Sequence, residues 1–315
     1  MRVHKTFRKG WNMSSANIVV LGNTNVDLTA YLPREIEGGE TLIAKNFTIG
    51  LGGKGANQAV AAQRAGGRVS FIGRVGSDNF GDLMLDGLAK ENLDLTHVER
   101  GPGESANATI WVQQNGENKI AVFLGESANM QPEGVARSVS MHAEASYFVS
   151  QLEVHQEVVL AGLIEAKKNN LITVLNIAPY SALDSEILRN TDWLIANEVE
   201  ISALIESQGL ELPENFSVDR MRDVMPVWSA ALGVNLIVTL GSLGAVGVNQ
   251  TSEAAFISAP KVQAVDTVGA GDCFIGFFVA ALNKGLDWDK AIHAGVIAAS
   301  ESVQRPGAQS SYPHS

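Results

Sequence analysis

The chain has a single cysteine, Cys273, so no disulfide can form within it. No apolar stretch approaches the length of a membrane span, which argues against a membrane partner. No long run of lysine or arginine offers the basic face of a nucleic-acid binder, and the formal net charge is −11. These absences favour a protein that acts on small molecules in the reducing cytosol, and we expect a cytoplasmic location.

The 315 residues, 45% apolar and 18% charged, suffice for one large α/β domain with a substantial core. Residues 1–13 are basic and non-periodic and lack the apolar middle of a secretory signal. We expect residues 1–15 to be a disordered extension, or translation to start at Met13, with organellar targeting as the less favoured alternative. Residues 16–315 would then form the functional domain.

Short apolar runs from residue 146 onward alternate with helical patterns, which predicts a parallel sheet covered on both faces. Strands are predicted at 18–21, 69–72, 147–150, 172–175, 193–196 and 236–239. Polar segments follow five of them and would line one cleft beyond their carboxyl ends. These segments are 23–27, 151–153, 176–179, 197–200 and 239–244.

Three further segments do not fit the alternation of strands and helices. Residues 42–49 read as a half-exposed strand, followed by a glycine loop at 50–55 and a closely packed helix at 56–65. Residues 108–112 and 120–124 flank Asn115-Gly116, a strong hairpin signal. We interpret these strands as a small separate sheet that serves as a lid or an interface.

The most informative motif is Asp266-Thr-Val-Gly-Ala-Gly-Asp272, a glycine-rich turn that opens directly into an apolar helix. The unpaired N–H groups of a first helical turn bind anions, and Asp272 stands beside them. An anion site with a neighbouring proton acceptor is typical of a phosphoryl-transfer enzyme. The structural alternative is an acid that only complements the helix dipole.

A second glycine motif, Gly50-Leu-Gly-Gly-Lys-Gly55, satisfies the dinucleotide pattern only weakly. The acid expected after the next strand is missing, and Gly55 stands where a phosphate-binding P-loop needs Ser or Thr. A nicotinamide oxidoreductase is therefore the weakest hypothesis. The loop remains open to a small ligand, with Asn57 just inside the following helix.

Other candidate residues are ambiguous when taken singly. Asp27, Asn57 and Glu153 could bind vicinal hydroxyls. Taken singly, each is better explained as a helix cap or a solvated loop residue, and only jointly, at one edge of the sheet, do they moderately favour a sugar site. Asn197 and Glu200 open a helix, so a capping pair and a phosphate or Mg²⁺ site are about equally favoured. Cys273 is read as a buried helix residue rather than a nucleophile.

Taken together, these motifs resemble the ribokinase branch of the PfkB carbohydrate kinases from about Ile18 to Pro313. Gly52 to Asn57 is similar to the family's N-terminal signature and Asp266 to Asp272 to its C-terminal one, although Phe277 departs from the usual small residue. Gln151-Leu-Glu153 resembles the sugar-contacting segment, and the tail 305–311 resembles a monovalent-cation loop in which Pro306 replaces a basic residue.

The resemblance implies an α/β/α three-layer sandwich with a mainly parallel sheet, plus a β lid formed near 31–49 and 106–125. It implies a homodimer joined through the lid, and exposed edge strands give such pairing a physical motive. It implies ATP as co-substrate, with Mg²⁺ and K⁺. The implied roles are sugar binding by Asp27, Gly53, Asn57, Glu153 and Asp272; catalysis by Asp272 as the base; an anion hole at Gly269, Ala270 and Gly271; ATP binding by Asn197, Thr239, Gly241 and Gly244; water-mediated Mg²⁺ binding by Glu200; and K⁺ binding by Asp266, Val268, Ser302, Arg305, Gly307 and Ser311.

The leading functional hypothesis is ATP-dependent phosphorylation of the 5-hydroxyl of D-ribose. Deoxyribose, fructose, a nucleoside or another furanose is the alternative acceptor, because one hydroxyl contact can decide between them. A non-catalytic sugar-binding regulator is a further alternative, which the retention of Asp272 beside the glycines disfavours.

Overall fold

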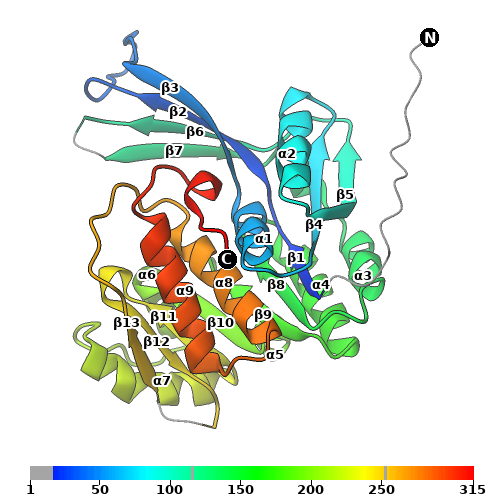
Figure 1. Ribbon diagram of the computed structural model, residues 1–315, viewed down its shortest axis with the longest axis vertical. Helices are drawn as coiled ribbons and strands as arrows, with labels where there is room; N and C mark the ends of the chain where they lie inside the picture. Colours follow the sequence, from blue (N-terminus) through cyan, green and yellow to red (C-terminus); the bar gives the residue numbers. More distant parts are fainter. Residues whose placement is uncertain (1–16, 115–116, 252–253) are drawn as a thin grey trace.

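The computed structural model describes residues 17–114, 117–251 and 254–315. The predicted extension at 1–15 and the Asn115-Gly116 turn lie outside these residues. A nine-stranded sheet runs through the body in the order β13-β12-β11-β10-β9-β8-β1-β4-β5 (Figure 1). Its strands are β1 (Ile18–Leu21), β4 (Val69–Gly76), β5 (Asp94–Gly101), β8 (Tyr147–Gln151), β9 (Ile172–Asn176), β10 (Trp193–Asn197), β11 (Asn235–Thr239), β12 (Gly244–Val248) and β13 (Ala255–Ser258).

Neighbouring strands from β5 to β11 are parallel, whereas the pairs β11–β12 and β12–β13 are antiparallel. This confirms the predicted mainly parallel sheet. The helices are α1 (Lys54–Arg64), α2 (Asn79–Lys90), α3 (Pro132–Ser140), α4 (Gln156–Lys168), α5 (Ser185–Arg189), α6 (Glu198–Ser207), α7 (Val218–Leu232), α8 (Ala270–Asn283) and α9 (Trp288–Ser302). In the described ranges none of them combines the length and the hydropathy of a membrane-crossing helix.

Each face of the sheet carries its own hydrophobic core, as strand alternation requires. In β1, Val19 and Leu21 join the core beneath α3 to α7, whereas Ile18 and Val20 join the core beneath α1, α8 and α9. Both faces are thus buried, which explains why these strands read as continuous apolar runs. The predicted three-layer α/β/α sandwich is confirmed.

Helices α1 and α8 pack unusually closely. A Cβ atom placed on Gly276 of α8 would come within 2.7 Å of the Gln58 carbonyl oxygen and 2.5 Å of the Ala62 amide nitrogen of α1. Only glycine permits that approach. Because the two helices begin at the same end of the sheet, close packing brings their first turns together.

A second, four-stranded sheet projects from the body (Figure 1), and we call it the projecting sheet. Its order is β3-β2-β6-β7, with β2 (Asn25–Tyr31), β3 (Asn46–Gly52), β6 (Asn107–Val112) and β7 (Asn118–Phe123). The strand predicted at 42–49 is shifted, because β3 begins at Asn46 and continues through the predicted glycine loop to Gly52. Helix α1 accordingly begins at Lys54, two residues before the predicted start at Ala56.

The strand β2 was not predicted, since its first residues were read as a polar turn. The reason is that the polar side chains at its start, those of Asn25 and Asp27, are buried or half-buried rather than solvated. Asp27 pairs with Gly50, and the Asp27 carboxylate fills the space that a side chain on Gly52 would need, with its Cγ atom 2.8 Å from an ideal Cβ position. The two glycines therefore belong to the ladder and leave room for this carboxylate.

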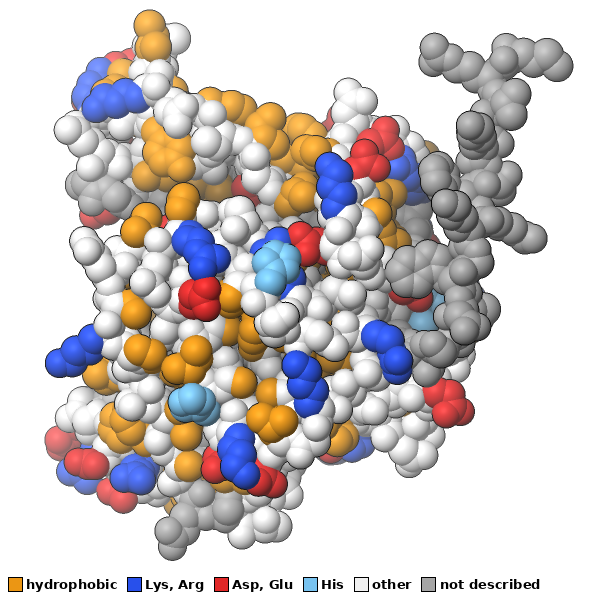
Figure 2. Space-filling view, in the orientation of Figure 1, with side chains coloured by type: hydrophobic (Ala, Val, Ile, Leu, Met, Phe, Trp, Pro, Cys, Tyr) orange, Lys and Arg blue, Asp and Glu red, His pale blue; other side chains and the backbone are white. Residues whose placement is uncertain are grey.

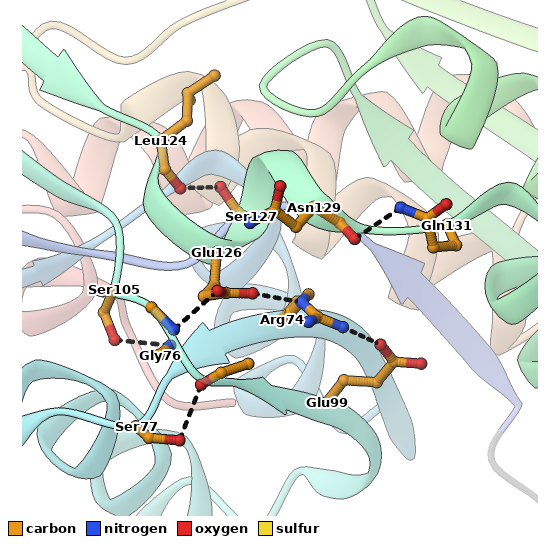
Figure 3. Close-up of polar contacts among 12 residues, drawn as sticks. Arg74, Gly76, Ser77, Glu99, Ser105, Leu124, Glu126, Ser127, Asn129 and Gln131 are labelled. Atoms are coloured by element: carbon orange, nitrogen blue, oxygen red, sulfur yellow. Dashed lines mark hydrogen bonds and ion pairs between the residues drawn. The ribbon is translucent and has the colours of Figure 1, made fainter.

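A polar cluster fastens the root of the projecting sheet to the body (Figure 3). Glu126 lies in the short 3₁₀ helix Gly125–Asn129 that follows β7, and its carboxylate accepts from Arg74 Nε of β4 at 2.7 Å and from the Gly103 amide at 2.9 Å. Arg74 also pairs with Glu99 of β5 at 2.6 Å. The Glu126 carboxylate thus links the segment before β6, through Gly103, and the segment after β7, in which Glu126 lies, to strand β4.

Beyond its root, the projecting sheet exposes large apolar side chains. Figure 2 shows hydrophobic side chains gathered over this part of the molecule. The exposed residues are Tyr31, Phe47, Ile49, Trp111, Ile120, Val122 and Phe123. Near the root, by contrast, Val26 packs against Val75 and Met84 and is buried. The strand register places Phe47, Ile49, Trp111 and Phe123 on one face and Tyr31, Ile120 and Val122 on the other, so both faces of the outer sheet expose apolar side chains.

Candidate active site

The polar segments predicted to share one edge of the sheet do so. They follow β1, β8, β9, β10 and β11, which are consecutive, parallel neighbours in the sheet. The first turns of α1 and α8 reach the same place, as the contacts below show. The sequence prediction of a single cleft at the carboxyl ends of the strands is consistent with this geometry.

Asp272 stands in the first turn of α8 and is only 6% exposed. Its Oδ2 atom accepts from Asn57 Nδ2 at 3.0 Å, and its Oδ1 atom accepts from Gln58 Nε2 at 2.9 Å. An acid that merely complemented the helix dipole would face solvent. Here the carboxylate is instead held in place by two side chains of another helix.

The predicted anion hole precedes Asp272 directly. Gly269 is the N-cap of α8 with φ of 73°, a left-handed conformation that favours glycine, and its carbonyl accepts from the Tyr312 hydroxyl at 3.0 Å. Ala270 and Gly271 then form the first residues of the helix, and Gly271 is exposed. The first amides of a helix have no partner within the helix, although that of Ala270 donates to the Thr267 carbonyl at 3.3 Å.

The predicted sugar-binding residues come from three elements. Glu153 accepts from the Lys54 amide at 2.7 Å, which places it beside Gly53 and α1. Asp27 accepts from Asn25 Nδ2 at 2.6 Å, and Asn57 Oδ1 accepts from Gln309 Nε2 at 3.0 Å. Burial raises the pKa of Asp27 and of Glu153 above their ordinary values. The hydrogen bonds and charges around these two carboxylates therefore do not fully offset the cost of removing them from water.

No role is assigned to Lys54 from the sequence, because the glycine motif around it does not match a P-loop. The negative charge of Asp272 is the main cause that raises the pKa of Lys54, with further contributions from Glu153 and Glu200. One cation therefore lies among three carboxylates of the cleft. Asn25, another residue that the sequence reasoning missed, orients Asp27 through the hydrogen bond described above.

Asn197 and Glu200 form a capping box at the start of α6, which is one of the two alternatives that the sequence leaves open for them. Asn197 Oδ1 accepts from the Glu200 amide at 2.9 Å, and Glu200 Oε2 accepts from the Asn197 amide at 3.0 Å. Burial raises the pKa of Glu200, and the charges of Lys54 and Asp272 also act on it. Capping thus fixes Glu200 within electrostatic reach of the cleft.

The candidate ATP residues of β11 and its following turn lie next to this cap. Thr239 is paired with Asn197 across β10 and β11. Gly241 and Gly244 have φ of 53° and 120°, so the turn after β11 has a backbone that side chains rarely allow. A Cβ on Gly244 would come within 2.8 Å of the Ala259 amide nitrogen. The turn therefore packs against the backbone at the end of β13 too closely for a side chain at Gly244.

The residues of the predicted cation loop are gathered in space. Asp266 accepts from the amides of Val268 at 3.0 Å and Gly307 at 2.8 Å. The Arg305 amide donates to the Ser302 carbonyl at 3.1 Å, and the Arg305 guanidinium lies 3.4 Å from the Ser311 carbonyl. The oxygen-rich tail is thereby fastened to the segment that leads into α8.

Cys273 is fully buried, and burial raises the pKa of its thiol to about 12. The thiolate is the reactive form, so this cysteine is a packing residue, as predicted.

Comparisons with known proteins identify the family of the chain. Residues 15–315 match the profile described as "pfkB family carbohydrate kinase", and the chain belongs to that family. It is 37% identical to a ribokinase of Haemophilus influenzae over 298 residues, covering 94% of this chain and 95% of the relative. It is 35% identical to a deoxyribokinase of Salmonella typhi, covering 94% and 95%.

Among solved structures, an Arabidopsis thaliana ribokinase complexed with ribose and ATP has a TM-score of 0.84 and 28% identity. The alignment covers 95% of this chain and 96% of that one. The α/β fold with its projecting sheet is therefore the fold of the ribokinases, and the protein is a carbohydrate kinase.

Proposed function

We propose that the protein transfers the γ-phosphoryl group of ATP to the 5-hydroxyl of D-ribose, forming ADP and ribose 5-phosphate. Full-length similarity to ribokinases supports the substrate pair. The observation that carries the proposal is the buried Asp272 carboxylate, held by Asn57 and Gln58 at the start of α8. The family alone implies a kinase, whereas this geometry supports Asp272 as the group that receives the proton.

In the proposed reaction the sugar lies against Asp27, Gly53, Asn57 and Glu153. The 5-hydroxyl donates to Asp272 while its oxygen attacks the γ-phosphorus. The bond from that phosphorus to the β,γ-bridging oxygen breaks, and the hydroxyl proton passes to Asp272. Because phosphoryl transfer goes through a loose transition state, orientation of the hydroxyl and late proton acceptance suffice.

The backbone amides of Gly269, Ala270 and Gly271 stabilise the charge that develops on the migrating group. The ammonium of Lys54 offsets the same charge from the side of α1, which the electrostatic coupling of Lys54 to Asp272 supports. Asn197, Thr239, Gly241 and Gly244 hold the nucleotide at the adjoining strand ends. Closure of the projecting sheet over the sugar excludes water, so that ATP is not hydrolysed.

The donor sets fit two cations. Glu200, fixed by its capping box, supplies a carboxylate suited to hydrated Mg²⁺, which balances phosphate charge. The oxygens of Asp266, Val268, Ser302, Arg305, Gly307 and Ser311 suit K⁺, whose charge would steady the turn before α8. We place the enzyme in the cytoplasm, where its lone buried cysteine stays reduced.

Dimerisation through the projecting sheet completes the proposal. Tyr31 of β2 and Ile120 and Val122 of β7 provide the surface, since they lie on one face of the part of the sheet that the body does not cover. Pairing of two such sheets would bury these side chains and protect the edge strands from other partners.

A panel of sugars with coupled ADP detection tests the proposed substrate. Ribose is expected to give the highest kcat/KM, and 2-deoxyribose is the second candidate because a deoxyribokinase is 35% identical to this chain. Loss of one hydroxyl partner in a polar site lowers kcat/KM by about 100-fold or more. A deoxyribose kcat/KM above that of ribose would reassign the acceptor, and no ADP release with any sugar would refute the kinase proposal.

A further inference from the structure

Gln58 is almost fully buried, with 1% exposure, and it stands between two other polar groups. Its Nε2 atom donates to Asp272 Oδ1 at 2.9 Å, and its Oε1 atom accepts from Gln151 Nε2 at 2.6 Å. Gln151, at the end of β8, is completely buried. A chain of two amides therefore leads from the central sheet to the carboxylate.

The orientation of this chain follows from Asp272. An ionised carboxylate only accepts, so Gln58 must present its NH₂ group to Asp272. Its carbonyl oxygen then faces Gln151, which must in turn present its own NH₂ group. The consequence is that Gln151 Oε1 has no hydrogen-bond partner among the described residues.

An unpartnered buried carbonyl costs free energy, so the arrangement is not explained by stability. The fold accommodates it closely, because a Cβ atom on Gly22 would collide with this oxygen. A further hydrogen bond, from Gln58 Nε2 to Asn176 Oδ1 at 3.3 Å, ties the same amide to the end of β9. The chain thus connects Asp272 to two strand ends of the sheet.

We propose that Gln58 is a positioning residue that fixes the rotation of the Asp272 carboxylate, and that Gln151 acts through Gln58. This inference rests on the proposed role of Asp272. Asn57 is proposed to touch the sugar, whereas Gln58 is 1% exposed and its side-chain hydrogen bonds go to Asp272, Gln151 and Asn176. Gln58 therefore contributes to turnover rather than to sugar affinity.

The variant Gln58→Met removes the hydrogen bonds of Gln58 to Asp272, Gln151 and Asn176 with little change in side-chain volume. We expect kcat to fall about 10- to 100-fold, the loss typical of one hydrogen bond to a charged group, with KM for ribose and ATP nearly unchanged. Gln63→Met is the matched control, since Gln63 lies on the same helix and accepts from the Val69 amide at 3.0 Å away from Asp272. It should keep wild-type kcat.

Gln151→Met provides the second arm, because it removes the donor to Gln58 without touching Asp272. We expect a smaller fall in kcat, and the double variant should be no slower than Gln58→Met alone, as two residues acting in series require. A kcat within about twofold of wild type for folded Gln58→Met would overturn the proposal. Strict additivity in the double variant would overturn the role given to Gln151.

Two controls keep the result interpretable. If Gln58→Met does not fold, the kcat of Gln151→Met alone tests the proposal. An unchanged kcat in that variant overturns it. Asp272→Asn is assayed alongside. Substantial turnover in that variant would refute the role of Asp272, whereas an inactive Asp272→Asn with a fully active Gln58→Met would refute only the role of Gln58.

Discussion

Asn57 and Asp272, 215 positions apart in the chain, are joined by a 3.0 Å hydrogen bond between buried side chains. The contact exists because Gly276 lets α1 and α8 approach and because both helices start at the same sheet edge. It joins the residue proposed to hold the sugar to the residue proposed to receive its proton. The spacing between substrate and base is therefore set by the packing of two helices.

We predict that the ionised Glu153 carboxylate lowers the stability of the ligand-free protein while it serves sugar binding. Burial raises the pKa of its carboxyl above the ordinary 4.5, so the stability contribution is complete below 4.5 and is lost as pH rises through the folded-state pKa. Glu153→Gln stays neutral, and the ligand-free variant should be more stable than wild type at neutral pH. The difference should vanish in acid below 4.5.

Urea denaturation at neutral and acidic pH measures this difference, and the KM for ribose should rise in the same variant. Glu157→Gln serves as the control, because Glu157 is an exposed acid of the neighbouring helix α4. A Glu153→Gln protein that is less stable than wild type at neutral pH would contradict the prediction.

Glu126 is predicted to anchor the projecting sheet. Its side chain is 5% exposed and that of Arg74 is 18% exposed, so Glu126→Gln weakens a largely buried ion pair and should cost about 3 kcal/mol of unfolding free energy. Because the same carboxylate holds both connections to β6 and β7, the KM for ribose should rise more than the KM for ATP. Denaturation curves and initial rates measure the two effects.

Asp192→Asn is the matched control for Glu126. Asp192 also pairs with a cation, Lys167 at 2.6 Å, and accepts from a backbone amide, that of Thr173 at 2.9 Å, but it lies in the body. It should lose some stability and leave both KM values unchanged. Equal KM changes in the two variants would remove the special role of Glu126.

The tail loop predicts a preference for K⁺ over Na⁺. Asp266 accepts hydrogen bonds from the amides of Val268 and Gly307 at the segment leading to α8. Because this segment leads directly into the turn before Asp272, cation binding there should raise turnover about 10-fold. Asp266→Asn should remove the preference, whereas Asp287→Asn, an exposed acid before α9, should retain it. Identical wild-type rates in KCl and NaCl would argue against the loop as a cation site.

The exposed apolar surface of the projecting sheet predicts a dimer. Ile120 of β7 is 55% exposed, and a charge there would have to be buried at the proposed interface. Sedimentation velocity should show a dimer for wild type and a monomer for Ile120→Glu. Val227→Glu changes an apolar residue of α7 that is 63% exposed, and it should remain dimeric. A wild-type monomer at micromolar concentration would exclude this interface.

The sequence revealed those parts of the site that local chemistry marks. Asp272 was found because a glycine turn opens into an apolar helix, and the shared cleft was found because polar segments follow parallel strands. Gln58 was missed, since its role depends on contacts with Asp272 and Gln151, which are remote in sequence. Strand β2 was missed because the buried and half-buried polar residues at its start, Asn25 and Asp27, look like a turn in the sequence.

The most direct test of the central claim is single-turnover transfer of labelled γ-phosphate from ATP to ribose by wild type and Asp272→Asn. The account predicts formation of ribose 5-phosphate by wild type and a rate at least about 100-fold lower in the variant, with its fold and nucleotide affinity retained. A variant that transfers phosphate at nearly the wild-type rate would contradict the assignment of Asp272 as the proton acceptor.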